Sequence, residues 1–244
     1  AERVFAMVDE GRDTHFECWR SSDLVNKREL EISIARFGVD GTLSLLSIVD
    51  RTAEAVSRIN LRREMMSDSL TGFCNRTGFE EEIEGAIDIL TKSGSVSTYA
   101  IILIDLARFS RVNESVGAMA GDELIITVAH RLNSRIRGNE ILCRLGGNEF
   151  ALFVGLGGSG VDIEPIAKRL TDAFVEPCKL SNLEIQVECA VAAAVGDVGG
   201  DDPMDTLRHA QIALKRAKFT KSFELYATGT VDNARRRFSM ETDL

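Results

Sequence analysis

The sequence predicts an α/β fold, with a central mixed sheet flanked by helices and a small antiparallel sheet before it. Strand-like and helix-like segments alternate from about residue 76 to residue 226, as they do when helices pack on both faces of a sheet. Residues 99–105 are apolar until their final aspartate, which is typical of a central strand buried on both faces. With 244 residues, 44% of them apolar, the chain is long enough for a sizeable core.

Composition narrows the class of partner. The net charge of -9 and the isoelectric point near 5.0 argue against a broad surface for nucleic acid or an anionic membrane, but leave room for a local pocket that binds one nucleotide. No apolar stretch reaches the roughly 18 residues of a membrane span. The cysteines are odd in number, scattered and never in a CxxC pair, so neither a disulfide framework nor a zinc site is indicated, and a cytoplasmic location is predicted. They are Cys18, Cys74, Cys143, Cys178 and Cys189.

Three strand-like segments occupy the first 50 residues. Residues 15–19, 29–35 and 43–49 alternate and cluster as strands, which predicts an antiparallel meander. Three strands make a thin sheet that is marginal alone, so we expect it to pack on a partner or to belong to a truncated domain.

A helix is expected over residues 50–67. This stretch has neither proline nor glycine, and Val56, Ile59 and Met66 recur at helical spacing. The stripe suits a parallel coiled-coil linker that dimerises the chain, and it equally suits a helix lying on its own domain. Because the stripe is short and contains Arg63, both interpretations stay open.

The remaining elements follow in order along the chain. Helices are expected over about residues 76–92, 118–136, 161–175 and 203–219, and strands over 99–105, 184–195 and 222–226. Asp105 ends the strand predicted to be central, and a carboxylate at the end of a buried strand is a candidate functional residue.

A glycine hairpin lies between the helices expected at 118–136 and 161–175. Gly146 and Gly147 separate two short apolar strands and precede the polar pair Asn148 and Glu149. Adjacent glycines supply φ freedom and let a ligand approach the backbone closely, but the same pattern forms ordinary tight turns. On local evidence the ordinary hairpin is the simpler interpretation.

Four segments in this order resemble those of the GGDEF family of diguanylate cyclases. They are residues 68–76 (DSLTGFCNR), residues 105–113 (DLARFSRVN), Gly117 with Gly121 and Asp122, and residues 146–150 (GGNEF). The resemblance covers about residues 67–227. It implies a fold similar to the nucleotidyl cyclase and polymerase palm, and an activity in which two GTP-loaded domains face each other and join two GTP molecules into cyclic di-GMP.

The resemblance also implies a Mg²⁺ site, used when GTP is bound, at Asp105, the backbone carbonyl of Leu106 and the third motif residue, here Asn148. Two-metal phosphoryl transfer needs anionic oxygens, whereas an amide oxygen carries no charge and accepts no proton from a ribose hydroxyl at neutral pH. Glu149 comes next, but adjacent strand residues point to opposite faces, so we expect a poor substitute. The catalytic candidates are thus Asp105, Asn148 and Glu149, with activity impaired at Asn148.

Among the nucleotide contacts that the resemblance implies, those to the base are better preserved than those to the phosphates. Asn113 and Asp122 match the pair that reads the guanine edge, although without this match a helix cap or turn would be the simpler interpretation of each. Ser110 and Ser222 stand where the family has a lysine and an arginine, and losing two cations weakens triphosphate binding. The nucleotide-binding candidates are Asn113, Asp122, Gly146, Gly147 and Lys218.

Arg137 and Glu140 lie at the offset of the family's inhibitory product site, an RxxD motif whose carboxylate is here one methylene longer. Binding of cyclic di-GMP at this pair and a plain surface ion pair are both open.

The flanking segments complete the predicted organisation. Residues 1–50 resemble the C-terminal part of a PAS sensor domain, 51–66 form a signalling linker helix, 67–228 form the GGDEF domain, and 229–244 begin a helix towards an EAL phosphodiesterase domain in the same parent chain. We expect a homodimer whose GGDEF domain is impaired as a cyclase and acts as a GTP-sensing regulatory module. An active diguanylate cyclase and a scaffold that binds no nucleotide are the alternatives.

Overall fold

The computed structural model describes residues 14–20, 28–37, 43–94, 98–157, 163–181 and 183–226. The helix expected at residues 229–244 lies outside them. The chain divides into two compact units between Glu64 and Met65. Among the described residues, no helix combines the length and the apolar character needed to cross a membrane.

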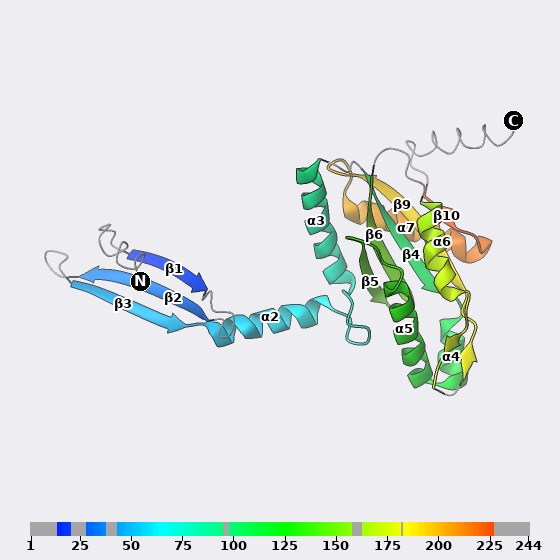
Figure 1. The fold of residues 1–244 in the computed structure, drawn as a ribbon, viewed down its shortest axis with the longest axis horizontal. Coiled ribbons are helices and arrows are strands. Elements are labelled where there is room, and N and C mark those ends of the chain that lie inside the picture. Colours follow the sequence, from blue (N-terminus) through cyan, green and yellow to red (C-terminus); the bar gives the residue numbers. More distant parts are fainter. Residues whose placement is uncertain are drawn as a thin grey trace. The chain divides into compact units, whose positions relative to one another are not determined.

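The first unit is a three-stranded antiparallel sheet followed by a helix (Figure 1). Strands β1 (Thr14–Arg20), β2 (Glu29–Phe37) and β3 (Leu43–Asp50) pair in chain order, which confirms the predicted meander. Helix α2 (Thr52–Met66) follows β3 directly. The Asp50 carboxylate accepts a hydrogen bond from the Thr52 backbone N–H at 2.9 Å, and so satisfies a donor at the start of the helix.

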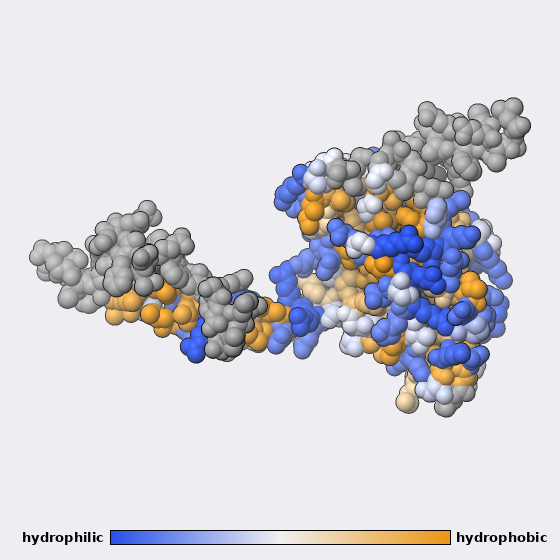
Figure 2. All heavy atoms as spheres, in the orientation of Figure 1, coloured by the Kyte–Doolittle hydropathy of each residue, from blue (hydrophilic) through white to orange (hydrophobic). Residues whose placement is uncertain are grey.

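Apolar side chains are exposed on both elements that end this unit, and Figure 2 shows them as orange spheres over the sheet and α2. Contiguous exposed apolar surface often marks an interaction site. The exposed residues are Leu45, Leu46, Ile48 and Val49 on β3, and Val56, Ile59 and Leu61 on α2.

The second unit is built around a five-stranded mixed sheet in the order β10-β9-β4-β6-β5. Strand β4 lies at its centre, antiparallel to both β6 and β9, whereas β10 joins β9 in parallel. The strands are β4 (Thr98–Leu106), β5 (Ile141–Gly146), β6 (Glu149–Leu156), β9 (Cys189–Asp197) and β10 (Glu224–Leu225).

Helices cover both faces of this sheet (Figure 1), and the two-residue period of β4 decides which core each side chain enters. The even-numbered residues from Ala100 to Leu106 pack in one core with α5 and α6, and the odd-numbered residues from Tyr99 to Leu103 pack in the other with α3 and α7. The predicted α/β fold is confirmed. The helices are α3 (Arg76–Ser93), α5 (Ala118–Asn133), α6 (Glu164–Thr171) and α7 (Pro203–Thr220).

One helix was not predicted from the sequence. Helix α4 (Phe109–Val116) is only eight residues long and lacks a side-chain cap. It begins after Arg108, whose φ of 58° is unusual for a residue other than glycine. A short helix entered through a left-handed residue gives none of the usual start signals, so periodicity alone does not reveal it.

The strand expected at 184–195 is interrupted. Strand β8 (Glu184–Ile185) pairs with β7 (Cys178–Lys179) in a separate two-stranded sheet, and β9 starts only at Cys189. The helix expected at 161–175 is the shorter α6, continued by a 3₁₀ turn at Asp172–Phe174.

Candidate functional site

Charged side chains from three elements meet where the central strand ends. Asp105, next to last in β4, lies directly opposite Glu149, the first residue of β6. Lys218 of α7 reaches both carboxylates, since its Nζ lies 2.7 Å from Asp105 Oδ2 and 3.5 Å from Glu149 Oε1. Three of the predicted site residues are thus brought together.

Asn148 lies beside them, in the turn that precedes β6. Its Nδ2 donates a hydrogen bond to the Leu106 carbonyl oxygen at 2.7 Å, and the Leu106 N–H donates to the Asn148 carbonyl at 3.1 Å. The expectation that Glu149 points away from the site is wrong. Because Asn148 belongs to the turn, strand alternation does not relate the two residues, and both side chains reach the end of β4.

Burial and charge oppose each other at this cluster. Burial raises the pKa of the Asp105 carboxyl above its ordinary 3.8, while the Lys218 ammonium and a hydrogen bond from Asn148 act to lower it. Burial acts to lower the pKa of Lys218, but the hydrogen bonds and charges of Asp105 and Glu149 outweigh it and raise that pKa above 10.5. Lys218 therefore stays charged between two carboxyl groups.

These residues fit a divalent metal poorly. The Leu106 carbonyl already accepts the Asn148 amide, and Asp105 is already paired with Lys218. An amide in place of a carboxylate also removes negative charge from the oxygen donors that Mg²⁺ prefers. In the part of the chain that the structure describes, no three His, Cys, Asp or Glu side chains are grouped to hold a metal ion. The site satisfies its anionic oxygens with donors of the protein itself.

The predicted base readers lie on two helices that pack together, Asn113 on α4 and Asp122 on α5. The Asn113 side-chain oxygen is buried and has no hydrogen-bond partner in the structure, whereas Asp122 is exposed. A Cβ built on Gly121 would lie 1.8 Å from that oxygen, so only glycine permits this approach. A buried acceptor without a partner calls for an explanation, and a ligand that donates hydrogen bonds would supply one.

The hairpin and the two serines show what is available for phosphate binding. Gly146 and Gly147 adopt φ of 133° and 55°; the first requires glycine and the second favours it. Ser110 and Ser222 are exposed, and Ser222 Oγ lies 3.0 Å from the Thr220 hydroxyl. Neither serine supplies positive charge, so Lys218 is the remaining predicted cation.

At the predicted product site, the ion pair that Glu140 forms is buried and not exposed. One oxygen of Glu140 accepts the Arg137 backbone N–H at 2.8 Å, and the other pairs with Arg169 of α6 at 2.5 Å. The Glu140 and Arg169 side chains are only 9% and 12% exposed. The carboxylate is therefore held inside the chain, while the Arg137 side chain lies at the surface. Sequence reasoning missed Arg169, because nothing in its spacing from Glu140 indicates a contact.

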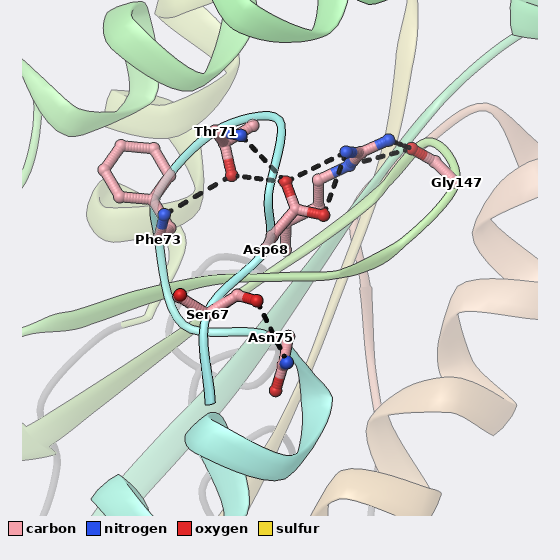
Figure 3. Close-up of polar contacts among 7 residues, drawn as sticks. Ser67, Asp68, Thr71, Phe73, Asn75 and Gly147 are labelled. Atoms are coloured by element: carbon pink, nitrogen blue, oxygen red, sulfur yellow. Dashed lines mark hydrogen bonds and ion pairs between the residues drawn. The ribbon is translucent and has the colours of Figure 1, made fainter. Parts of the chain in front are cut away.

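Another ion pair, between Asp68 and Arg144, connects the loop before α3 to the hairpin (Figure 3). Arg144 Nη1 donates to both Asp68 oxygens at 3.0 and 3.1 Å, and its Nε and Nη2 donate to the Gly147 carbonyl at 3.1 and 2.7 Å. Asp68 also accepts the Thr71 hydroxyl at 2.7 Å. One arginine thus fixes the glycine turn relative to the loop that follows α2.

The sheet, its two helical layers and the polar hairpin at the end of its central strand define an α/β domain with a polar site at one edge of its sheet. The chain belongs to the GGDEF family, because residues 65–222 match the family described as diguanylate cyclase, GGDEF domain. Its place is thus in bacterial cyclic di-GMP signalling.

Relatives in that family carry different names. The chain is 29% identical over 160 residues to the diguanylate cyclase TpbB of Pseudomonas aeruginosa, which is 65% of this chain and 36% of TpbB. It is 29% identical over 174 residues to the cyclic di-GMP phosphodiesterase PdeR of Escherichia coli, which is 71% of this chain and 26% of PdeR. The chain therefore spans about a quarter to a third of these curated relatives.

A solved structure supports the fold. The fragment of Pseudomonas aeruginosa TpbB that comprises only the GGDEF domain superposes with a TM-score of 0.60 at 29% identity, and the match covers 66% of this chain and 94% of that one.

Proposed function

We propose that this is a regulatory GGDEF domain that binds GTP and is impaired in condensing it to cyclic di-GMP. The observation that supports this most directly is the end of β4, where Lys218 pairs with Asp105 and the Asn148 amide covers the Leu106 carbonyl. A Mg²⁺ ion at this position would compete with both contacts and would gain no charge from Asn148. Phosphoryl transfer relies on such charge compensation, so turnover is expected to be weak or absent.

Binding of the base is expected to persist. The unpartnered Asn113 oxygen and the exposed Asp122 carboxylate are acceptors, and guanine presents N–H donors along the edge that such acceptors read. With Ser110 and Ser222 in place of cations, the triphosphate depends on Lys218 and on the glycine turn, which favours weak binding over loss of binding.

An active diguanylate cyclase is the second candidate, and one observation favours it. The carboxylates of Asp105 and Glu149 come from the neighbouring strands β4 and β6 and both contact Lys218. Both carboxylates would be free for catalysis if Lys218 turned towards a phosphate. This candidate predicts GTP consumption that requires Asp105.

The wider organisation is part of the proposal. The first unit would be the end of a PAS sensor domain and α2 a linker through which two copies associate, since Val56, Ile59 and Leu61 are exposed apolar residues on that helix. The relative PdeR carries the name of a phosphodiesterase, which supports a parent chain with an EAL domain whose activity this domain regulates in the cytoplasm.

The test combines binding with turnover. The purified chain is incubated at high concentration with GTP and Mg²⁺, the nucleotides are separated by chromatography, and GTP binding is measured by calorimetry. We expect binding without cyclic di-GMP, and loss of binding when Asn113→Ala and Asp122→Ala are combined. Asn133→Ala, at the exposed end of α5, is the matched control and should bind as the unaltered chain does.

The outcomes separate the candidates. Cyclic di-GMP that disappears in Asp105→Ala would establish the active cyclase. An absence of GTP binding in the unaltered chain would leave a scaffold that binds no nucleotide.

A further inference from the structure

Two cysteines far apart in the sequence lie side by side in the second unit. Cys74, in the loop before α3, and Cys143, in β5, are partners in an isolated parallel β-bridge, and the Arg144 N–H donates to the Cys74 carbonyl at 3.0 Å. Neighbouring strands lie about 4.7–4.9 Å apart. That spacing falls within the roughly 4.4–6.8 Å that separates the Cα atoms of a disulfide.

The thiols themselves point into the space between the two segments. Cys74 Sγ lies 3.4 Å from the Leu142 carbonyl oxygen, and Cys143 Sγ lies 3.3 Å from the Asn75 carbonyl oxygen. Each thiol therefore donates towards the backbone of the opposite segment, which brings the two side chains together between the same two segments. Both thiols are free in the structure.

The two cysteines have unequal surroundings. Cys143 is fully buried in the core that contains Phe79 and Ile83, whereas Cys74 is half-buried. The neighbouring Cys143 side chain lowers the pKa of the Cys74 thiol although burial opposes it, whereas the Cys74 side chain and burial both raise the pKa of Cys143. Burial also raises the pKa of Cys178. A partly exposed thiol of lowered pKa beside a buried second thiol is the arrangement of an attacking and a resolving cysteine.

We propose that Cys74 and Cys143 form a reversible disulfide site that is oxidised by hydrogen peroxide. The Cys74 thiolate attacks one peroxide oxygen, the O–O bond breaks, hydroxide leaves, and Cys74 becomes a sulfenic acid. Cys143 then loses its proton and attacks the Cys74 sulfur, the S–O bond breaks, and the hydroxyl leaves as water. The two thiols give up two electrons, one peroxide is reduced to two waters, and one S–S bond forms.

The position of the site gives the bond a consequence. Cys74 immediately precedes Asn75, whose side chain caps α3, and Cys143 immediately precedes Arg144, which holds both Asp68 and the Gly147 carbonyl. The disulfide would join covalently the same loop and strand that the ion pair of Arg144 already joins. The redox state would thereby act on the segment that connects α2 with the glycine hairpin.

Peptide mapping tests the proposal on the unaltered chain. Each of the five cysteines falls in a different tryptic peptide, with Cys74 in residues 64–76 and Cys143 in residues 138–144. The chain is treated with graded hydrogen peroxide, blocked with iodoacetamide, digested without reduction and analysed by mass spectrometry. We expect these two peptides to appear linked, the number of free thiols to fall from five to three, and dithiothreitol to restore all five.

Variants assign the roles. In Cys143→Ala the link should vanish and Cys74 should accumulate as sulfenic or more oxidised acid, whereas Cys178→Ala, the matched control, should form the link as the unaltered chain does. The proposal is overturned if the two peptides remain separate after oxidation, or if Cys74 links to any other cysteine, including Cys74 of a second chain.

Discussion

At Gly121 the absence of a side chain lets helices α4 and α5 approach each other closely. A Cβ there would lie 1.8 Å from the Asn113 side-chain oxygen, a distance that real Cβ atoms do not show. Gly121→Ala is therefore expected to displace Asn113 and to destabilise the fold by about 1–3 kcal/mol, as overpacking does. GTP affinity should fall with it, and urea unfolding together with calorimetry would measure both effects.

Gly85→Ala is the matched control for that substitution. Gly85 lies within α3, and a Cβ there meets nothing within 4 Å. Alanine in an exposed helix interior stabilises by roughly 0.5–1 kcal/mol relative to glycine. The same chemical change should thus have opposite signs at the two positions, and a similar loss at both would refute the steric argument.

Lys218 provides a prediction with a defined pH dependence. The folded state holds the pKa of Asp105 above 3.8, so between 3.8 and that pKa it binds more protons than the unfolded chain, and stability falls as the pH rises. Lys218 limits this rise in the pKa of Asp105, because its positive charge favours the ionised carboxyl. In Lys218→Met the pKa of Asp105 rises further, and the decline should extend to higher pH. At pH 7 Lys218→Met should lower the free energy of unfolding by about 1–2 kcal/mol, because it leaves a buried carboxylate without its partner. The loss is no larger because Lys218 is 40% exposed.

The control for Lys218→Met is Lys215→Met, an exposed position on the same helix. A second comparison uses Asp105→Asn, in which Lys218→Met should cost little, because the buried charge is gone. Urea unfolding of the four variants between pH 4 and pH 8 gives the slopes. Parallel curves for Lys218→Met and the unaltered chain would show that the ammonium does not control Asp105.

At the scale of helices, strands and loops, Arg144 connects strand β5 to the loop from Ser67 to Asn75. Burial acts to raise the pKa of Asp68, but the hydrogen bonds from Thr71 and Arg144 outweigh it and lower that pKa below 3.8. Asp68 therefore contributes stability above pH 3.8 that is lost as the pH falls through its folded pKa. Arg144→Met should destabilise by roughly 2–4 kcal/mol at pH 7, because it leaves a carboxylate only 18% exposed without its charged partner.

The measurement for Arg144 is urea unfolding from pH 7 downwards. The difference between the unaltered chain and Arg144→Met should shrink as Asp68 becomes protonated, and Arg76→Met, at an exposed position in the first turn of α3, should leave stability nearly unchanged. A difference that stays constant to pH 3 would mean that Arg144 acts through its contacts with Gly147 alone.

Periodicity and burial predicted the elements well where both extend over many residues. The uninterrupted apolar run of β4 identified the central strand, and the helical stripes identified α3, α5 and α7. Helix α4 could not be predicted from periodicity, because it is short and uncapped. The break before β9 could not be predicted either, because it depends on a tertiary contact in which the Glu188 carbonyl accepts the Ala107 N–H.

The candidate site was predictable in composition but not in geometry. The motif placed Asp105, Asn148 and Lys218 in one site, yet the alternation rule misplaced Glu149, because the turn ends where β6 begins. The contact between Cys74 and Cys143 leaves no trace in cysteine spacing, because a parallel bridge outside the main sheet creates it.

At the scale of the whole molecule, the two units differ in how much apolar surface they bury. Strand β4 of the second unit is buried on both faces, whereas the first unit leaves most of the described β3 side chains and the stripe on α2 exposed. Three strands and one helix, the part of this unit that the structure describes, make a thin layer, so we expect the missing burial to come from a partner surface or from the rest of a longer domain. In the proposed dimer, α2 of a second copy covers the stripe on α2.

Charge introduced into this stripe should separate the copies without unfolding the second unit. Val56 and Ile59 are 50% and 55% exposed, one helical turn apart on α2. We expect the unaltered chain to sediment as a dimer, and Val56→Glu combined with Ile59→Glu to weaken the dimer at least tenfold, about 1.4 kcal/mol. Ser57→Glu, an exposed polar position on the same helix, should retain the dimer. Analytical ultracentrifugation measures the association, and near-ultraviolet circular dichroism monitors the fold of the second unit. If the double variant and Ser57→Glu dimerise equally well, the stripe does not join the copies, because two buried carboxylates facing their counterparts cannot leave an apolar interface intact.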